Sequence, residues 1–221
     1  MLWYDMAGVQ RACRVFLMLD FPAALRAGAP DFSLPNPARP AMPAVPYRRL
    51  LQARSVYSSP LGPLHVGATA EGLAGAWFEP QKYFSVDELD GVPVAPEHPV
   101  LKQAALALDR YFAGKELQNP PLTFVEGSPF QQRVWHALVG IPQGHTSTYG
   151  ALANALGCPG GARAIGMAVS RNPVSLFVPC HRVVGAGQQL TGYAGGLDRK
   201  IALLELEHAL VPEPEQDLFP Q

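Results

Sequence analysis

A cysteine followed directly by a histidine is the pair of residues in this sequence best suited to chemistry. Cys180 and His181 come after Pro179, at the end of an apolar run, residues 174–178, that predicts a buried strand. A turn or helix start at a strand end can present backbone N–H groups to the sulfur, and these dipoles stabilise the reactive thiolate. His181 can remove the thiol proton, and a carboxylate behind it, for which Glu207 is the candidate, can fix its tautomer.

Three other interpretations of Cys180 stay open from the residues alone. Most buried cysteines are small core residues, and neighbours on a regular strand point in opposite directions. Cys158, Cys180 and His181 are soft metal ligands, but they lack the paired spacing of structural zinc sites, so we predict no metal site. A cysteine hydrolase would use Cys180 and His181 with Asn172 as the orienting residue, and would also need an oxyanion hole.

Two predicted short helices lie ahead of this segment and form a helix-turn-helix candidate. The first spans about residues 148–156, and the second opens near Gly161 and cannot outlast Asn172-Pro173. About four residues, glycine among them, join the two helices. Small residues surround Arg163 on the second helix, so this helix can press against a groove while the arginine reaches further in. Small residues also permit ordinary close packing of helices.

Charge is unevenly distributed along the chain. The 221 residues include 17 Lys+Arg and 18 Asp+Glu, a formal net charge of -1, which removes the argument for nucleic-acid binding that a globally basic chain would give. Residues 128–197 nevertheless contain no Asp or Glu, but four arginines and three histidines. A carboxylate-free, mildly positive surface suits a phosphate backbone, and a buried domain of low charge explains the pattern equally well.

The middle of the chain predicts a small sheet and two helices. Three short strands, at residues 55–57, 64–68 and 73–78, are separated by turn residues and form an antiparallel β-meander. A helix follows at about residues 100–112, where apolar side chains recur every four positions. Residues 128–131, Ser-Pro-Phe-Gln, have the form of a capping box that begins another helix.

Composition narrows the class of protein further. Seven prolines in the first fifty residues predict a mobile arm. No apolar run approaches the ~20 residues that a membrane-spanning helix needs. Three cysteines without C-x-x-C spacing favour a reducing compartment, and the first twenty residues lack a convincing export signal, so we predict a cytoplasmic protein with no membrane partner.

Several short motifs, taken together and in order, give the chain a family resemblance. They are FQQRVW at residues 130–135, TYG at 148–150, ARAIG at 162–166, RNPV at 171–174, PCHRV at 179–183 and TGYAGGL at 191–197. These motifs resemble those of the O6-alkylguanine-DNA alkyltransferases, also called methylated-DNA–protein-cysteine methyltransferases. The resemblance is strong over about residues 127–207 and weaker over 55–84.

The resemblance implies a direct-reversal DNA repair protein. The alkyl group on O6 of guanine in double-stranded DNA, with O4-alkylthymine as an open second substrate, passes irreversibly to Cys180, so each molecule acts once. His181, an ordered water and Glu207 form the proton relay, and Tyr149 delivers a proton to the base. No cofactor takes part, and a monomer is the simplest expectation for the oligomeric state. Some family members bind zinc in the N-terminal domain; here Cys13 is the only cysteine upstream, so that site is absent or incomplete.

The same resemblance assigns the remaining site residues. Arg163 fills the gap that the flipped-out nucleotide leaves in the DNA, and an alkylated guanine costs less to extrude than a normal base because it pairs poorly. Asn172 is a structural hinge between the recognition helix and the active-site segment. The DNA-binding residues are Arg163, Ala162, Tyr149 and Arg171, and the alkylguanine pocket consists of Val183, Tyr193, Ala194 and Gly195, with the carbonyls of Cys180 and Val183 accepting from the guanine amine.

The implied fold is α+β, with four segments along the chain. An arm at 1–52 precedes an N-terminal α/β domain at 53–125 that carries the β-meander. A C-terminal helical domain at 126–211 binds DNA, accepts the alkyl group and holds a winged-helix-like helix-turn-helix; a tail at 212–221 follows. The runner-up function is a non-catalytic sensor of alkyl lesions, but sensors of that type lack the nucleophile that Cys180 provides.

Overall fold

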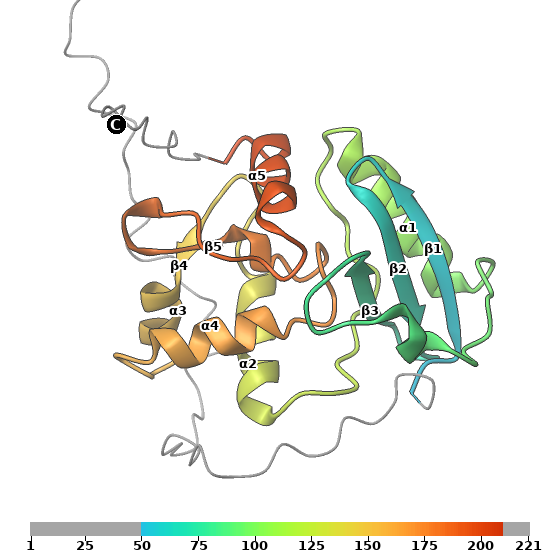
Figure 1. Cartoon of the computed structure of the whole chain (residues 1–221), viewed down its shortest axis with the longest axis horizontal. Helices are drawn as coiled ribbons and strands as arrows, with labels where there is room; N and C mark the ends of the chain where they lie inside the picture. Colours follow the sequence, from blue (N-terminus) through green and yellow to red (C-terminus); the bar gives the residue numbers. More distant parts are fainter. Residues whose placement is uncertain (1–49, 210–221) are drawn as a thin grey trace, which may run out of the picture. The chain divides into compact units, whose positions relative to one another are not determined.

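The computed structural model describes residues 50–209, and Figure 1 shows its helices and strands in chain order. The predicted arm up to residue 49 and the predicted tail at 212–221 lie outside the described residues. Leu51, at the end of the predicted arm, is only 5% exposed and packs in a small cluster with Trp77 and Val92. The last residues of that predicted arm are therefore packed against the sheet region.

A three-stranded antiparallel sheet opens the described part and confirms the predicted meander. It consists of β1 (Ala53–Ser59), β2 (Gly62–Ala68) and β3 (Leu73–Phe78), in the order β1-β2-β3. Helix α1 (Pro99–Phe112) covers one face through apolar side chains spaced three or four residues apart. A short 3-10 helix, η4 (Val86–Leu89), lies between the sheet and α1 in the sequence.

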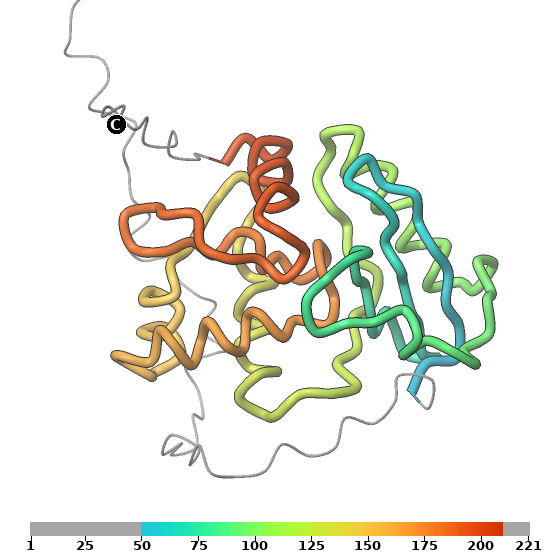
Figure 2. The backbone as a smooth tube through the Cα atoms, viewed as in Figure 1, coloured from blue at the N-terminus to red at the C-terminus, as the bar shows by residue number. Residues whose placement is uncertain are grey.

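The C-terminal half is mostly helical (Figure 2). Its elements are α2 (Pro129–Val139), β4 (Ser147–Thr148), α3 (Tyr149–Ala155), α4 (Ala162–Ser170), η5 (Cys180–Arg182), β5 (Val183–Val184), η6 (Ala186–Gln188) and α5 (Leu197–Leu206). The predicted capping box begins α2: Gln131 donates its backbone N–H to the Ser128 hydroxyl at 3.3 Å, and its side chain accepts from Ser128 N at 2.8 Å.

The two predicted short helices are α3 and α4, and they pack against each other and against α2. Residues 156–161 connect them, a longer link than the four residues expected, because α3 ends at Ala155 and Gly161 only caps α4. Trp135 of α2 donates its indole N–H to the carbonyl of Ala168 at 2.9 Å and fixes α4 on the bundle. Strands β4 and β5 form a parallel pair beside α3.

Residues 174–178 are buried as predicted, but they do not form the predicted strand. The run folds into a tight turn, with Leu176 at a φ of 72°, and Val178 N donates to Val174 O at 2.9 Å. Only its first residues pair with the sheet, where Ser175 N donates to Ala76 O at 2.8 Å. A continuous apolar run predicts that a segment is buried but does not predict its backbone conformation. The composition of residues 174–178 therefore could not distinguish a strand from a buried turn.

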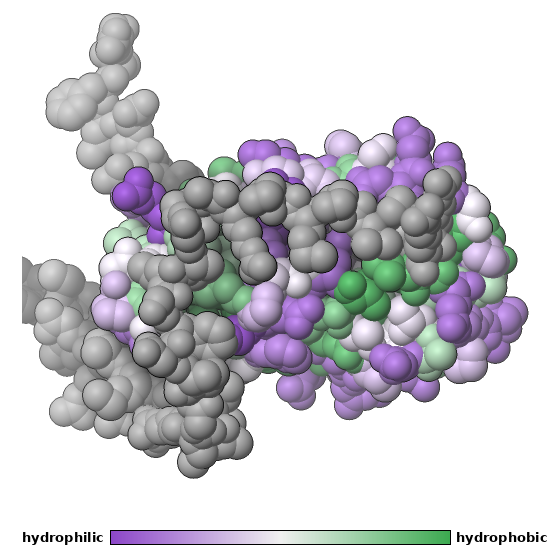
Figure 3. All heavy atoms as spheres, turned by 90° about the horizontal axis from the view of Figure 1, so that it is seen from below, coloured by the Kyte–Doolittle hydropathy of each residue, from purple (hydrophilic) through white to green (hydrophobic). Residues whose placement is uncertain are grey.

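The surface of the described part shows polar and apolar residues side by side (Figure 3). Such mixing is usual, because apolar atoms contribute more than half of the accessible surface of a folded protein. None of the helices between residues 50 and 209 is long and apolar enough to cross a membrane.

Candidate active site

Cys180 begins η5 and is almost completely buried, with 4% of its surface exposed. Its sulfur accepts a hydrogen bond from Nδ2 of Asn172 at 3.0 Å, and the backbone N–H of Cys180 also acts on it, as the sequence predicted for backbone N–H groups. Burial raises the pKa of the Cys180 thiol, against the opposing effects of the Asn172 hydrogen bond and the positive charge of Lys200. The thiol is therefore protonated at neutral pH and needs a base before it can attack.

Asn172 closes the buried turn that leads to the cysteine. Its Oδ1 accepts from Val174 N at 3.0 Å, and its Nδ2 donates to Val178 O at 2.8 Å as well as to the sulfur of Cys180. One side chain thus holds both ends of the turn and the nucleophile that follows it. The residue lies just after α4, at the junction where the resemblance places a hinge.

His181 lies next to the cysteine and is completely buried. Its Nε2 is 2.9 Å from Oε1 of Glu207, and its Nδ1 has no hydrogen-bond partner among the described residues. Burial lowers the pKa of His181, although the carboxylate acts to raise it. The imidazole is therefore neutral. Its Nε2 carries the proton and donates a hydrogen bond to Glu207, and the lone pair of Nδ1 is free to take a proton.

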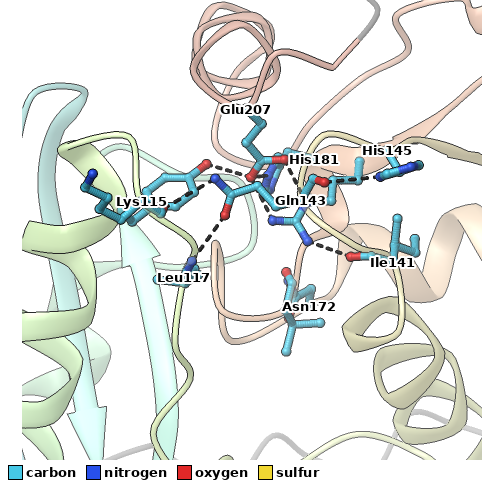
Figure 4. A network of polar contacts seen from close by, with 11 residues as sticks. Lys115, Leu117, Ile141, Gln143, His145, Asn172, His181 and Glu207 are labelled. Atoms are coloured by element: carbon cyan, nitrogen blue, oxygen red, sulfur yellow. Dashed lines mark hydrogen bonds and ion pairs between the residues drawn. The ribbon is translucent and has the colours of Figure 1, made fainter.

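Glu207 anchors a dense network of donors (Figure 4). Arg182 donates Nε to Oε2 and Nη2 to Oε1, both at 2.8 Å, and Tyr111 donates its hydroxyl to Oε1 at 2.8 Å. Burial raises the pKa of Glu207, but the hydrogen bonds from His181 and Arg182 outweigh it, and the pKa falls to about 2. The carboxylate is therefore ionised and fixes the histidine tautomer.

Lys200 is a buried residue of the site that the sequence reasoning missed. It is 0% exposed, and its Nζ donates to Val183 O at 2.6 Å and to Thr191 O at 3.1 Å. Burial lowers the pKa of Lys200 to about 8. A signal was present: positions 200, 203, 204 and 207 fall on one face of a helix, so Lys200 shares the buried face of α5 with Glu207.

The four residues of the predicted pocket lie beside this network. The Tyr193 ring is 6.5 Å from the His181 ring, edge on, and its buried hydroxyl interacts with the side chains of Cys180 and Ser175. The carbonyl of Ala194 accepts from Lys82 N at 2.8 Å, which ties the loop to the N-terminal half. Gly195 packs so closely on Tyr193 that a Cβ would lie 2.8 Å from its ring, so a side chain is excluded there. Val183 is fully buried.

The carbonyls expected to accept from the guanine amine already have protein donors. Val183 N donates to the carbonyl of Cys180, and Lys200 donates to the carbonyl of Val183. Each carbonyl oxygen has two lone pairs, so both keep one for a ligand.

The predicted DNA-binding residues lie on α3 and α4 or, for Arg171, at the C-terminal cap of α4. Arg163 is exposed on α4, and Ala162 is half-buried at the start of that helix. The Tyr149 hydroxyl is 3.0 Å from Oγ1 of Thr191, the residue whose carbonyl accepts from Lys200. Arg171 is exposed, and its guanidinium lies 3.8 Å from the centre of the Tyr83 ring.

Among residues 50–209, no group of three or more His, Cys, Asp or Glu side chains could hold a metal ion. Cys13, the cysteine weighed for a zinc site, lies outside the described residues. Cys158 and Cys180 are both free thiols.

Two family models match this chain, one in each half. The model for "6-O-methylguanine DNA methyltransferase, ribonuclease-like domain" matches residues 53–119. The model for "6-O-methylguanine DNA methyltransferase, DNA binding domain" matches residues 129–209, which include Cys180, His181 and Glu207.

Two relatives of similar sequence carry the same name. A methylated-DNA–protein-cysteine methyltransferase of Mycobacterium leprae is 45% identical over 158 residues, covering 72% of this chain and 93% of the relative. One of Methanosarcina acetivorans is 40% identical over 154 residues, covering 69% of this chain and 96% of the relative.

Similarity extends to a solved structure, the crystal structure of Mycobacterium tuberculosis OGT in complex with DNA. It matches with a TM-score of 0.65 and 40% sequence identity, over 71% of this chain and 92% of that one. With the buried cysteine, its histidine and its carboxylate described above, these matches show that the chain belongs to the methylated-DNA–protein-cysteine methyltransferase family.

Proposed function

We propose that this protein repairs DNA by direct reversal, moving the alkyl group from O6 of guanine onto Cys180. The proposal rests on two buried hydrogen bonds around the adjacent residues Cys180 and His181, one from Asn172 to the cysteine and one between the histidine and Glu207. The relatives of the chain are named for this transfer. A nucleophile that is neutral until deprotonated, beside a neutral base held by an ionised carboxylate, is the arrangement that nucleophilic catalysis requires.

The transfer step balances without a cofactor. The Cys180 thiol gives its proton to Nδ1 of His181, directly or through a water, and Glu207 stabilises the imidazolium that forms. The sulfur then attacks the alkyl carbon, the bond from that carbon to O6 breaks, and its electron pair passes to the purine. A proton from the tyrosine hydroxyl of Tyr149 or from the relay neutralises the purine. The product is an S-alkylcysteine thioether, so the thiol is consumed and each molecule acts once.

The DNA surface is proposed to be α3 and α4, in a winged-helix-like arrangement completed by β4 and β5. The exposed Arg163 on α4 enters the duplex where the damaged nucleotide leaves, and Ala162 allows the helix to approach closely. Arg171 contacts the backbone, and the absence of Asp and Glu from residues 128–197 removes repulsion from the phosphates.

The flipped guanine is proposed to occupy a pocket bounded by Val183 and by residues 193–195. The buried hydroxyl of Tyr193 supports this, because it interacts with the side chain of Cys180 and so places this loop beside the nucleophile. The proposed two-domain division, at 53–125 and 126–211, accords with the two separate family matches.

One experiment tests the proposal against its alternatives. The protein is mixed with a duplex oligonucleotide carrying radiolabelled O6-methylguanine, and the label on the protein is measured over time. We expect one equivalent on Cys180 and then no further reaction, with none in Cys180→Ala. Repeated turnover would indicate a cysteine hydrolase or another enzyme, and DNA binding without transfer by the reduced protein would indicate a lesion sensor.

A second measurement tests the role of Arg163. Arg163→Ala should slow transfer from duplex DNA but leave transfer from the free alkylated base unchanged, because the free base needs no extrusion. Equal transfer from duplex by wild type and variant would remove Arg163 from that role.

A further inference from the structure

The carboxylate of Glu207 receives a donor that the relay itself does not require. Tyr111, in α1 of the N-terminal half, donates its hydroxyl to Oε1 at 2.8 Å across 96 positions of sequence. The same oxygen lies 2.9 Å from His181 Nε2 and accepts from Arg182 Nη2 at 2.8 Å. Three donors therefore share one oxygen of the residue that holds the base (Figure 4).

The hydroxyl of Tyr111 is a polar group on the otherwise apolar buried face of α1. Every other buried residue of α1 is apolar, and Tyr111 is 0% exposed. A buried phenol without a partner would cost stability, and phenylalanine would fill the same space without that requirement. Burial, followed by the charge of Glu207, raises the pKa of Tyr111, so the phenol keeps its proton and always acts as the donor.

Resting on the proposed function, we propose that Tyr111 is a positioning residue of the relay: by sharing Oε1 of Glu207 it limits how strongly the carboxylate holds the proton of His181. An oxygen that accepts several hydrogen bonds has less charge to offer each donor. When His181 takes the thiol proton, its imidazolium is stabilised by what remains of that charge. Tyr111 thus keeps the histidine neutral, and able to act as a base, at lower pH.

The effect of the Tyr111 hydrogen bond on His181 can be measured apart from the effects of the other groups that face the histidine. Arg182, from η5, and Lys200, from α5, are cationic and disfavour the imidazolium, whereas Glu207 favours it. The Cys180 thiol and the phenol of Tyr193 are neutral at neutral pH, because burial raises the pKa of each. Removing only the hydroxyl of Tyr111 changes no charge, so the change in the pKa of His181 reports one hydrogen bond.

The test is the pH profile of single-turnover transfer by full-length Tyr111→Phe, with radiolabelled O6-methylguanine duplex. We expect the acid limb to move to higher pH by about half to one pH unit, as loss of one hydrogen bond to a charged group predicts. Below its midpoint the rate then falls about three- to tenfold, and the plateau at higher pH is unchanged. Tyr57→Phe is the matched control, since it removes a tyrosine–carboxylate bond of 2.8 Å, to Asp109, outside the network.

A structural role for Tyr111 would give a different result. An unchanged midpoint, or a rate lowered by the same factor at every pH, would overturn the proposal. If Tyr111→Phe does not fold, 3,5-difluorotyrosine at position 111 keeps the size of the ring and donates more strongly, so the acid limb should move to lower pH; no movement would also overturn it. NMR titration of His181 reads the same shift without substrate, so failure of transfer by the wild type would reject only the proposed function.

Discussion

At the scale of single residues, the site is built from side chains that each satisfy several partners. Asn172 makes three hydrogen bonds, and the carboxylate of Glu207 receives four, from Tyr111, His181 and Arg182. In a buried network of this kind every member fixes the others, so the nucleophile and its base are held in place before a substrate arrives. The same saturation makes the site sensitive to protonation.

Glu207 should make the stability of the protein depend on pH. Its pKa falls from 4.5 to about 2, because the hydrogen bonds from His181 and Arg182 outweigh the effect of burial. A carboxyl group whose pKa is depressed by folding stabilises the folded state above its ordinary pKa, and this contribution is lost as the pH falls toward 2. At about 1.4 kcal/mol for each pH unit, the contribution at neutral pH is about 3 kcal/mol.

The measurement is the free energy of unfolding by urea for wild type and Glu207→Gln at several pH values. We expect the difference between them to be largest above pH 5 and to shrink between pH 4.5 and 2, where the wild-type carboxyl becomes protonated and resembles the amide. Glu97→Gln, at an exposed pair with Lys102, is the control and should behave as wild type. A difference that stays constant over the whole range would contradict the ionised, buried carboxylate.

At the scale of elements, local signals predicted most of the fold. The capping box at Ser128, the three strands and the short helices each depend on residues close in sequence, and each is present. The turn at residues 174–178 was predicted wrongly because its shape depends on Asn172 and on the edge of β3, which are tertiary partners. Burial alone does not determine backbone conformation.

Some residues of the candidate site could likewise be predicted from the sequence, and others could not. Cys180, His181 and Glu207 carry their chemistry in their residue types, and the structure brings them into one buried cluster. Tyr111 and Lys200 were missed because each looks like an ordinary helix residue: the first as a core aromatic, the second as a surface cation. Only the tertiary structure reveals that Tyr111 reaches Glu207, whereas the position of Lys200 on the same helix face as Glu207 was a signal that the sequence did contain.

Gly166 allows a test of how α3 and α4 pack, and Gly127, which precedes α2, is the comparison. A Cβ at Gly166, inside α4, would lie 3.6 Å from the ring of Tyr149, an ordinary contact, whereas one at Gly127 would lie 2.4 Å from Trp135 at a φ of +91°. Gly166→Ala should therefore raise the free energy of unfolding by about 0.5–1 kcal/mol through helix propensity. Gly127→Ala, the same change where there is no room, should lower it by more than that amount.

Urea denaturation of both variants checks this pair. A loss of stability in Gly166→Ala would mean that the ring of Tyr149 lies closer to α4 than described, so that an added methyl group does not fit between α3 and α4.

At the scale of the whole described molecule, the active site is completed from both halves of the sequence. The segment after α4 extends the sheet, since Ala76 N donates to Pro173 O at 2.9 Å and Ser175 N donates to Ala76 O at 2.8 Å. Tyr111 reaches Glu207 from α1, and Lys82 N binds the pocket loop at Ala194. The sheet and α1 therefore hold the catalytic half in its working geometry and share one apolar core with it.

Arg199 is the strongest of these connections. Its guanidinium lies 4.9 Å from the centre of the Phe78 ring. It donates to four backbone carbonyls, those of Leu61, Pro80 and Gly195 at 2.8 Å and of Glu79 at 2.7 Å. Since Gly195 belongs to the proposed pocket loop, one side chain joins the N-terminal half to the wall of the pocket.

Arg199→Ala should lower the free energy of unfolding by about 2–4 kcal/mol, because charge-assisted hydrogen bonds to several carbonyls are lost together and only the exposed ones regain water. It should also slow alkyl transfer from duplex DNA and from the free alkylated base by the same factor, since a loosened Gly195 loop affects the pocket whatever delivers the base. This distinguishes it from Arg163→Ala, which should affect duplex alone. Lys102→Ala, which removes an exposed ion pair, serves as the control for loss of a cation. If Arg199→Ala slowed transfer from duplex only, Arg199 would act on DNA, and the argument that the N-terminal half shapes the pocket through it would fail.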